Sequence, residues 1–171
     1  MVNNMKRGFF TIISAQFFSS LADNALLIAA IAVLIEIAAP EWMRPLLKLF
    51  FTISYVLLAP FVGPFSDSMP KGKVMFLTNN IKIVGCLLIF FNVHPLAAYA
   101  IVGLGAASYA PAKYGILTEL LPPEKLVLAN GWLESTTVVS ILLGTLLGGL
   151  LITDTGSSKI LSLNFMKDLN I

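Results

Sequence analysis

Charged residues are scarce in this chain, at 12% of its 171 residues, compared with about 25% in ordinary soluble domains. Hydrophobic residues make up 57% of the sequence, and the mean hydropathy is +0.88. This balance excludes a water-soluble globular domain and indicates an integral membrane protein. The net charge of +2 is too small to indicate a nucleic-acid partner.

Cysteine and histidine are each present once, as Cys86 and His94. A single cysteine cannot form an internal disulfide or a metal site, so we interpret Cys86 as a small apolar residue within its hydrophobic run. His94 lies beside Pro95 between two apolar runs and is interpreted as a loop residue. The sequence also lacks a glycine-rich phosphate loop and the motifs of hydrolytic enzymes, so we expect no enzymatic activity, no cofactor and no metal.

Five apolar runs are long enough to cross the roughly 30 Å core of a bilayer, which takes about 20 residues. They cover residues 9–37, 46–66, 74–91, 96–120 and 129–152. Because lipid cannot satisfy free backbone amides, these runs predict helices, and they lack the polar–apolar alternation of barrel strands. We therefore predict an all-α membrane bundle over residues 1–152, followed by a polar tail over residues 153–171. The short connections predict that consecutive helices are antiparallel neighbours.

The cations of the connections predict the orientation of the bundle. Those expected on the side of the N-terminus are Lys6, Arg7, Lys71, Lys73 and Lys125. Arg44 and Lys48 fall on the other side. The positive-inside rule then places the N-terminus in the cytosol and, with five spans, the tail on the non-cytosolic side.

A polar stripe interrupts the first apolar run at helical spacing. It consists of Gln16, Ser19, Ser20, Asp23 and Asn24. A carboxylate in the bilayer centre costs about 2.5–3.5 kcal/mol on insertion scales, and such residues usually face a polar interior and serve a function. The stripe therefore predicts either the lining of a cavity or a polar clamp between helices, and for Asp23 we favour the cavity.

Two lysines lie inside the later runs and are candidate partners of Asp23. Lys82 in the third run could either reach the membrane surface with its long side chain or pair with a buried carboxylate. Lys113 in the fourth run has the same alternatives, and we expect it nearer the cytosolic side than Asp23. Pro111 should kink or open its helix, and Glu134 is expected to open the fifth span.

Small residues mark faces where helices can approach closely. Gly144 and Gly148 form a GxxxG pattern in the fifth run, and the fourth run is rich in glycine and alanine around Gly103 and Gly105. Such patterns favour close helix packing without any further function.

The connection between the second and third runs resembles a loop of the major facilitator superfamily. The shared features are Gly63, an acid four residues later at Asp67, and the basic residues Lys71 and Lys73. In physical terms Gly63 would let two helices approach, Asp67 would pair with a cation or face a helix N-terminus, and the lysines would hold the loop in the cytosol. The chain departs from the pattern at Ser68 and Pro70, where a basic residue and a glycine are usual.

The chain also resembles the bacterial lysophospholipid transporters of that superfamily. This longer resemblance covers residues 19–26, 55–63, 109–126 and 129–132. It implies the N-terminal part of a major facilitator bundle in the bacterial cytoplasmic membrane. It further implies flipping of lysophospholipid, chiefly lysophosphatidylethanolamine, to the inner leaflet, where an acyltransferase–acyl-carrier-protein synthetase re-acylates it. On this resemblance Asp23, Asn24 and Lys113 match cavity positions that gate or hold the head group.

The length of the chain departs from that family, whose members have about twelve spans in two halves with the site between them. Five spans stop before the first half is complete, so the sequence predicts a fragment that needs a missing second half or is inactive alone. The alternatives are a proton-coupled exporter of the same superfamily, with Asp23 as the proton carrier, and a non-transporting helical module that packs against another membrane protein.

Overall fold

The computed structural model describes residues 2–153, with side chains from Arg7 to Leu150. Five α-helices make up this part of the chain: α1 (Val2–Glu36), α2 (Met43–Asp67), α3 (Lys71–Phe90), α4 (Pro95–Leu120) and α5 (Pro123–Thr153). Each predicted apolar run lies within one helix or one residue of its end. The polar tail predicted for residues 153–171 lies, apart from Thr153, outside the described residues.

The helices extend past the apolar runs into the polar segments that flank them. The fifth helix begins at Pro123, well before the predicted start at residue 129, so Glu134 lies inside α5 and does not open it. Proline is favoured in the first turn because its missing N–H would have no partner there. At the start of α4 the His94 side chain accepts a hydrogen bond from the backbone N–H of Leu96, at 3.3 Å. The loop histidine is therefore a helix cap.

Four of the described helices, α1, α2, α3 and α5, are long and apolar enough to cross a membrane. The exception is α4, which was predicted as the fourth span. It is the most buried helix of the described bundle and is rich in alanine, glycine and tyrosine. A helix shielded by its neighbours does not face lipid, so small residues that allow close packing replace the large apolar ones. The chain is a multi-pass membrane protein, and α4 is the helix packed most deeply in the described bundle.

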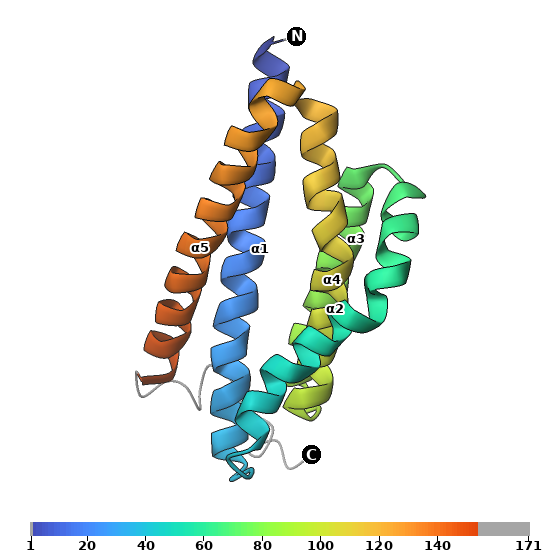
Figure 1. Cartoon of the computed structure of the whole chain (residues 1–171). Coiled ribbons are helices and arrows are strands. Elements are labelled where there is room, and N and C mark those ends of the chain that lie inside the picture. The colour runs from blue at the N-terminus through green and yellow to red at the C-terminus, as the bar shows by residue number, and fades with distance from the viewer. Residues whose placement is uncertain (1, 154–171) are drawn as a thin grey trace.

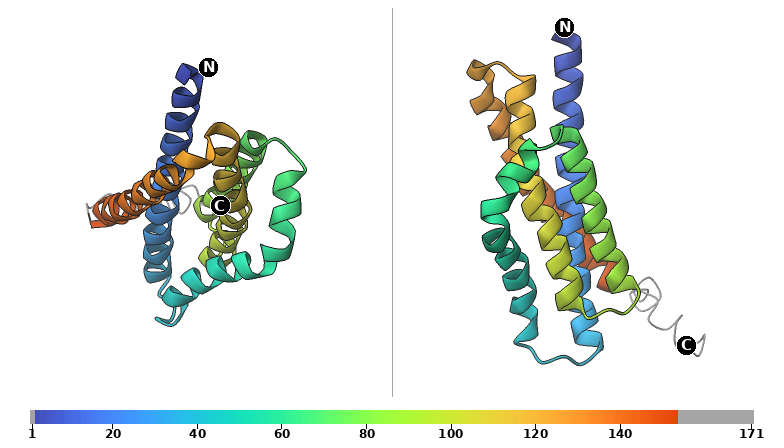
Figure 2. Two further views of the ribbon diagram at one scale, coloured as in Figure 1. Left: turned by 45° about the horizontal axis from the view of Figure 1, so that its top comes forward. Right: turned by 90° about the vertical axis from the view of Figure 1, so that its right-hand side faces the viewer.

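The starts of α1, α3 and α5 lie at one end of the bundle, and the starts of α2 and α4 lie at the other (Figures 1 and 2). The extensively packed pairs are α3 with α4, α1 with α5, and α2 with α4. Only the first of these pairs is consecutive in sequence. The expectation that short connections make neighbours is therefore wrong for α1 with α2, α2 with α3 and α4 with α5, which contact each other far less.

Glycines explain this choice of partners. A Cβ added at Gly144 would collide with the carbonyl oxygen of Leu21, and one at Gly148 would lie 3.1 Å from that of Ala25. The predicted GxxxG therefore seats α5 directly on α1. A Cβ at Gly103 would lie 2.9 Å from the α2 backbone at Phe51. Complementary small faces, more than loop length, decide which helices meet.

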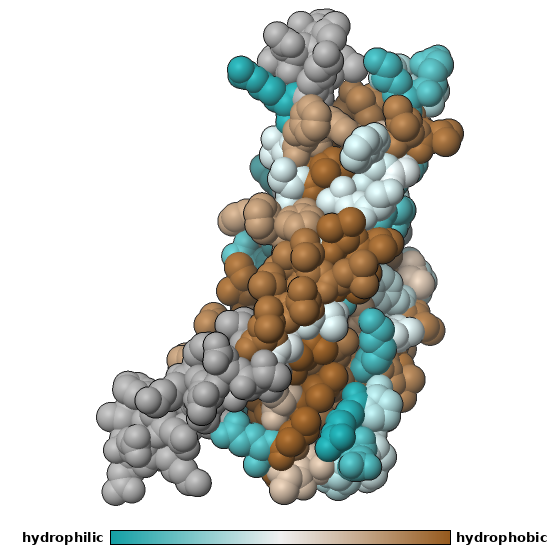
Figure 3. Space-filling model, turned by 90° about the vertical axis from the view of Figure 1, so that its left-hand side faces the viewer, coloured by the Kyte–Doolittle hydropathy of each residue, from teal (hydrophilic) through white to brown (hydrophobic). Residues whose placement is uncertain are grey.

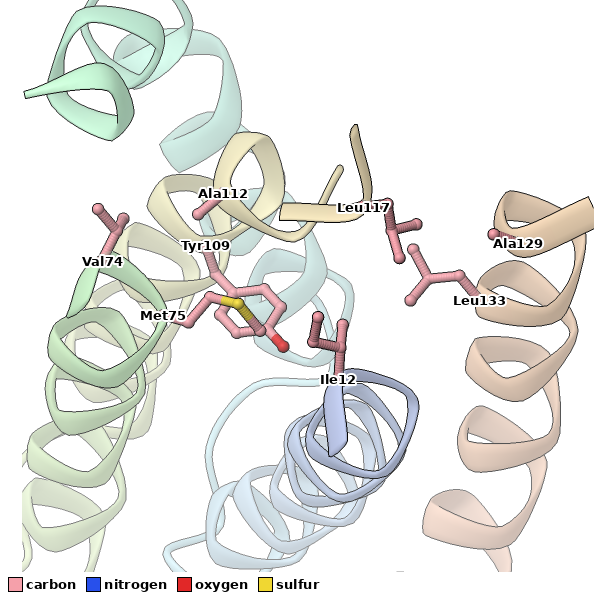
Figure 4. Close-up of a cluster of buried hydrophobic side chains, with 8 residues drawn as sticks. All are labelled: Ile12, Val74, Met75, Tyr109, Ala112, Leu117, Ala129 and Leu133. Atoms are coloured by element: carbon pink, nitrogen blue, oxygen red, sulfur yellow. The ribbon is translucent and has the colours of Figure 1, made fainter. Parts of the chain in front are cut away.

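Two buried apolar clusters hold the bundle together. The first joins α1, α3, α4 and α5, and Figure 4 shows its members Ile12, Val74, Met75, Tyr109, Ala112, Leu117, Ala129 and Leu133. The second, around Leu34, Leu47 and Val102, joins the four helices α1, α2, α3 and α4. On the outside, apolar side chains cover the middle of the face in Figure 3, and polar ones gather toward its ends. Such a surface suits a bilayer.

Prolines inside helices have different outcomes in this bundle. The second helix contains Pro60 and Pro64 and visibly changes direction (Figures 1 and 2), as expected where a proline removes a backbone hydrogen bond. The fourth helix stays helical through Pro111, from Pro95 to Leu120. The expected opening of the helix at Pro111 is therefore not found.

Candidate functional site

A polar cavity of about 200 Å³ lies between α1, α2, α4 and α5, with one side chain from α3. Its lining residues are Gln16, Ser19, Ser20, Asp23, Asn24, Lys48, Phe51, Tyr55, Lys82, Tyr99, Ala106, Tyr109, Ala110, Lys113, Thr137 and Ile141. The whole polar stripe of the first helix therefore faces one space. The helical spacing predicted that shared face, and the structure brings four other helices to it.

Asp23 and Lys82 form an ion pair at the edge of this cavity. The Lys82 Nζ donates to Asp23 Oδ2 at 2.6 Å, and the two side chains are only 10% and 16% exposed, respectively. The same Nζ donates to the Ser19 hydroxyl at 2.8 Å. It also lies 5.1 Å from the centroid of the Tyr109 ring. A buried pair needs such extra partners because both ions have lost their water.

Further hydrogen bonds fix the helix that carries Asp23. The Ser19 hydroxyl donates to Asn79 Oδ1 of α3 at 2.9 Å. The Tyr99 hydroxyl of α4 contacts the Asp23 carbonyl oxygen at 3.4 Å. Asn24 donates from its side-chain amide to the Ser20 carbonyl oxygen one turn earlier, at 2.8 Å. The sequence predicted either a cavity lining or a polar clamp between helices. In the structure the polar stripe does both, because it lines a cavity and also clamps α1 to α3.

Lys113 has a different partner and a different environment. Its Nζ lies 3.3 Å from Glu134 Oε1 of α5 and 4.7 Å from the centroid of the Tyr114 ring. The Tyr114 hydroxyl donates to the same carboxylate oxygen at 2.6 Å. The Lys113 side chain is 10% exposed, but that of Glu134 is 52% exposed. Of the two candidate lysines, the structure therefore pairs Lys82 with Asp23 and leaves Lys113 with a half-exposed carboxylate.

Lys48 was interpreted only as a loop cation, but it lines the cavity from the second turn of α2. Its Nζ lies 5.9 Å from the centroid of the Phe51 ring, and within the described part of the chain it forms no ion pair. A signal was present in the sequence, since Lys48, Phe51 and Tyr55 recur at spacings of three and four residues and so share one helix face.

The loop between α2 and α3 is tied together by Lys71. Its Nζ pairs with the Asp67 carboxylate and donates to the Ser66 carbonyl oxygen at 3.0 Å. Its aliphatic stem crosses Gly115 of α4, where an added Cβ would lie 3.0 Å from Lys71 Cε. One of the two pairings considered for Asp67, that with a cation, is therefore the one present. Lys73 is exposed on the same end of the bundle.

Gly63 does not have the role expected from the loop motif. An added Cβ at Gly63 would meet nothing within 4 Å in the described structure, so no helix packs closely on it there. Gly115 is the glycine at which this loop contacts the bundle. The expectation of close approach at Gly63 is therefore wrong for the described residues.

The charge of the cavity lining favours an anion that also carries hydrogen-bond donors. Three lysines and one aspartate line it, a formal balance of +2. The charge of Lys82 is compensated by Asp23 and that of Lys113 by the half-exposed Glu134, whereas Lys48 forms no ion pair within the described residues. Within the described residues no group of three or more His, Cys, Asp and Glu side chains could hold a metal ion.

A second, mostly apolar groove of about 380 Å³ adjoins the Asp23–Lys82 pair between α1 and α3. Its lining includes Phe18, Ile83 and Cys86. The ion pair therefore separates a polar space from an apolar one. Such an arrangement suits an amphiphile better than a small polar solute.

Comparison with known proteins adds three findings. Residues 12–162 match the Major Facilitator Superfamily. The chain is 50% identical over 145 residues to the lysophospholipid transporter LplT of Klebsiella pneumoniae, and 48% identical over 147 residues to that of Yersinia enterocolitica. These matches cover 85% and 86% of this chain, but only 36% of each relative. No solved structure matches the chain.

Proposed function

This chain belongs to the major facilitator superfamily, and on that premise we propose that it contributes the N-terminal helices of a lysophospholipid transporter. The observation that carries the proposal is the cavity, in which a compensated Asp23–Lys82 pair stands beside two further lysines. A lysophospholipid has an anionic phosphate, a polar head and one acyl chain. The lysines suit the phosphate, and the apolar helix faces suit the chain.

We assign the phosphate to Lys113, with Lys48 as a second cation. Lys48 lies near the start of α2 and Lys113 near the end of α4, so they stand toward opposite ends of the bundle. A phosphate moving along the cavity could pass from one cation to the other. Asp23 was expected either to hold the head group or to act in a gate, and its bond to Lys82 favours a gate pair.

The charges at the bundle ends support an orientation of the bundle in the membrane. Arg7, Lys71, Lys73 and Lys125 lie at the end where α1 starts, and the positive-inside rule places that end in the cytosol. We propose that the protein resides in the bacterial inner membrane and delivers lysophosphatidylethanolamine to the inner leaflet. An acyltransferase–acyl-carrier-protein synthetase would then be its functional partner.

The test is the flux of labelled lysophosphatidylethanolamine into vesicles that carry the full chain. The chain spans 36% of the length of the relatives it matches, so flux is measured for this chain alone and together with the remaining part of the Klebsiella relative. We expect Asp23→Asn to reduce the flux at least tenfold, because it removes the gate pair. Glu41→Gln is the matched control, since Glu41 is a carboxylate in an exposed surface pair with Arg44.

Unchanged flux in Asp23→Asn would refute the role of the gate pair. A flux that depends on an imposed proton gradient would instead support the proton-coupled exporter. If this chain gave no flux with any partner, while still inserting as a folded bundle, the non-transporting helical module would be the better account.

A further inference from the structure

Four buried side-chain polar atoms lack a hydrogen-bond partner in the described structure, and two of them belong to residues that line the polar cavity. These two are Oε1 of Gln16 and the hydroxyl of Tyr109. Gln16 is 5% exposed and Tyr109 is 4% exposed. Because buried polar groups in native proteins are nearly always paired, two unpaired atoms on residues that line one cavity require an explanation.

The orientation of the Gln16 amide follows from its neighbours. The Thr137 hydroxyl donates its hydrogen to the Leu133 carbonyl oxygen at 2.9 Å. It can therefore only accept from Gln16, and Gln16 Nε2 donates to it at 2.9 Å. The other end of the amide, Oε1, is then fixed as an acceptor without a donor. The cavity thus presents a fixed acceptor on α1.

The Tyr109 hydroxyl, which can both donate and accept a hydrogen bond, provides the second acceptor. Figure 4 shows this hydroxyl pointing toward α1 beside Ile12, and Gln16 follows Ile12 by one helical turn. Lys82 lies over the Tyr109 ring, but its Nζ bonds to Asp23 and Ser19 and not to the phenol oxygen. No described side chain therefore donates to either orphan atom, which leaves the donors to a bound molecule or to water.

Resting on the proposed function, we propose that Gln16 and Tyr109 determine head-group specificity by accepting hydrogen bonds from the N–H groups of an ethanolamine head. Tyr109 and Lys113 are four residues apart on α4, so they lie on one face with Cβ atoms about 5–6 Å apart. A phosphate bound to Lys113 would place the ammonium, two carbons away, beside Tyr109. A head group without N–H donors would leave both acceptors buried and unpaired, so it is disfavoured.

Stepwise methylation of the ammonium tests this assignment. The probes are lysophosphatidylethanolamine, its N-methyl and N,N-dimethyl forms, and lysophosphatidylcholine, all with one acyl chain. They carry three, two, one and no N–H donors. Their affinities are measured by displacement of radiolabelled lysophosphatidylethanolamine from the full chain in nanodiscs. With two acceptors, the first methyl should cost little, and the second and third should each weaken binding by about 3- to 10-fold.

Each single variant should remove one of the two methylation steps that weaken binding. Tyr109→Phe removes only the hydroxyl and keeps the ring, so one acceptor remains and only the third methyl should weaken binding. Gln16→Leu should give the same profile, and the double variant should bind all four probes alike. Ser108→Ala is the matched control, because its hydroxyl donates to Leu104 on the same helix and does not line the cavity. Ser108→Ala should keep the loss of affinity at both the second and the third methyl group.

The outcomes separate the two proposals. Equal affinity of the original chain for all four probes would overturn the role of Gln16 and Tyr109, and would leave lysophospholipid binding intact. The proposed role would also be overturned if Tyr109→Phe and Gln16→Leu both kept the original dependence of affinity on methylation. Failure of the original chain to bind any of the four probes would overturn this inference together with the proposed function.

Discussion

The two intramembrane ion pairs of this bundle have similar chemistry and opposite surroundings. Asp23 and Lys82 lie 2.6 Å apart, and Ser19 and Tyr99 add hydrogen bonds around them. Lys113 and Glu134 lie 3.3 Å apart, and the carboxylate side of that pair is half exposed. The first pair is locked by helices on both sides of it. The second can release its lysine, because the Tyr114 hydroxyl still donates to the carboxylate that is left behind.

The comparison shows how one cavity can combine a rigid element with an adaptable one. A desolvated pair is costly to separate, so it holds α1 and α3 in a fixed relation. An open pair contributes little to stability, so its cation can turn to a ligand at low cost. We therefore assign to Asp23–Lys82 a gate that opens only at an energetic cost, and to Lys113 the binding of the ligand.

Asp23→Asn should have the largest effect on stability, since it leaves the Lys82 charge buried without a partner. We expect a loss of about 3–5 kcal/mol in the free energy of unfolding, measured by denaturation in detergent micelles. Adding Lys82→Met to the same chain should restore most of that loss, because no buried charge then remains. If Asp23→Asn alone were as stable as the original chain, the Asp23–Lys82 pair would not be desolvated.

Gly144→Ala should have an intermediate effect, because it disturbs the contact that holds α1 and its Asp23 against α5. The added methyl would collide with the Leu21 carbonyl oxygen, and overpacking of this kind costs about 1–3 kcal/mol. The measurement is again unfolding in detergent. Gly149→Ala is the control, since its Cβ would meet nothing within 4 Å and alanine favours a helix. Equal losses in both variants would contradict the proposed seating of α5.

Glu134→Gln should have the smallest effect on stability. Because the Glu134 side chain is 52% exposed, we expect a change of less than about 1 kcal/mol. The Tyr114 hydroxyl can still donate to the amide oxygen of glutamine. A loss as large as that of Asp23→Asn would remove the distinction between the two pairs.

The sequence predicted the helices and the polar face of α1, because bilayer thickness and helical spacing act locally. It could not predict which lysine pairs with Asp23, since that depends on how α3 and α4 are placed. It also missed the cavity position of Lys48, whose place near a connection resembled that of an ordinary loop cation. The pairing of α1 with α5 was hidden for a similar reason: a GxxxG pattern indicates close packing and does not name the partner.

The central claim is that Lys113 serves the ligand and not only Glu134. The most direct test compares the affinity of Lys113→Gln and Glu134→Gln for lysophosphatidylethanolamine in nanodiscs. Lys113→Gln removes a charged hydrogen bond and should weaken binding by about 10- to 100-fold. Glu134→Gln frees the lysine and should leave binding equal or tighter. Equal weakening in both variants, or no change in Lys113→Gln, would contradict the account.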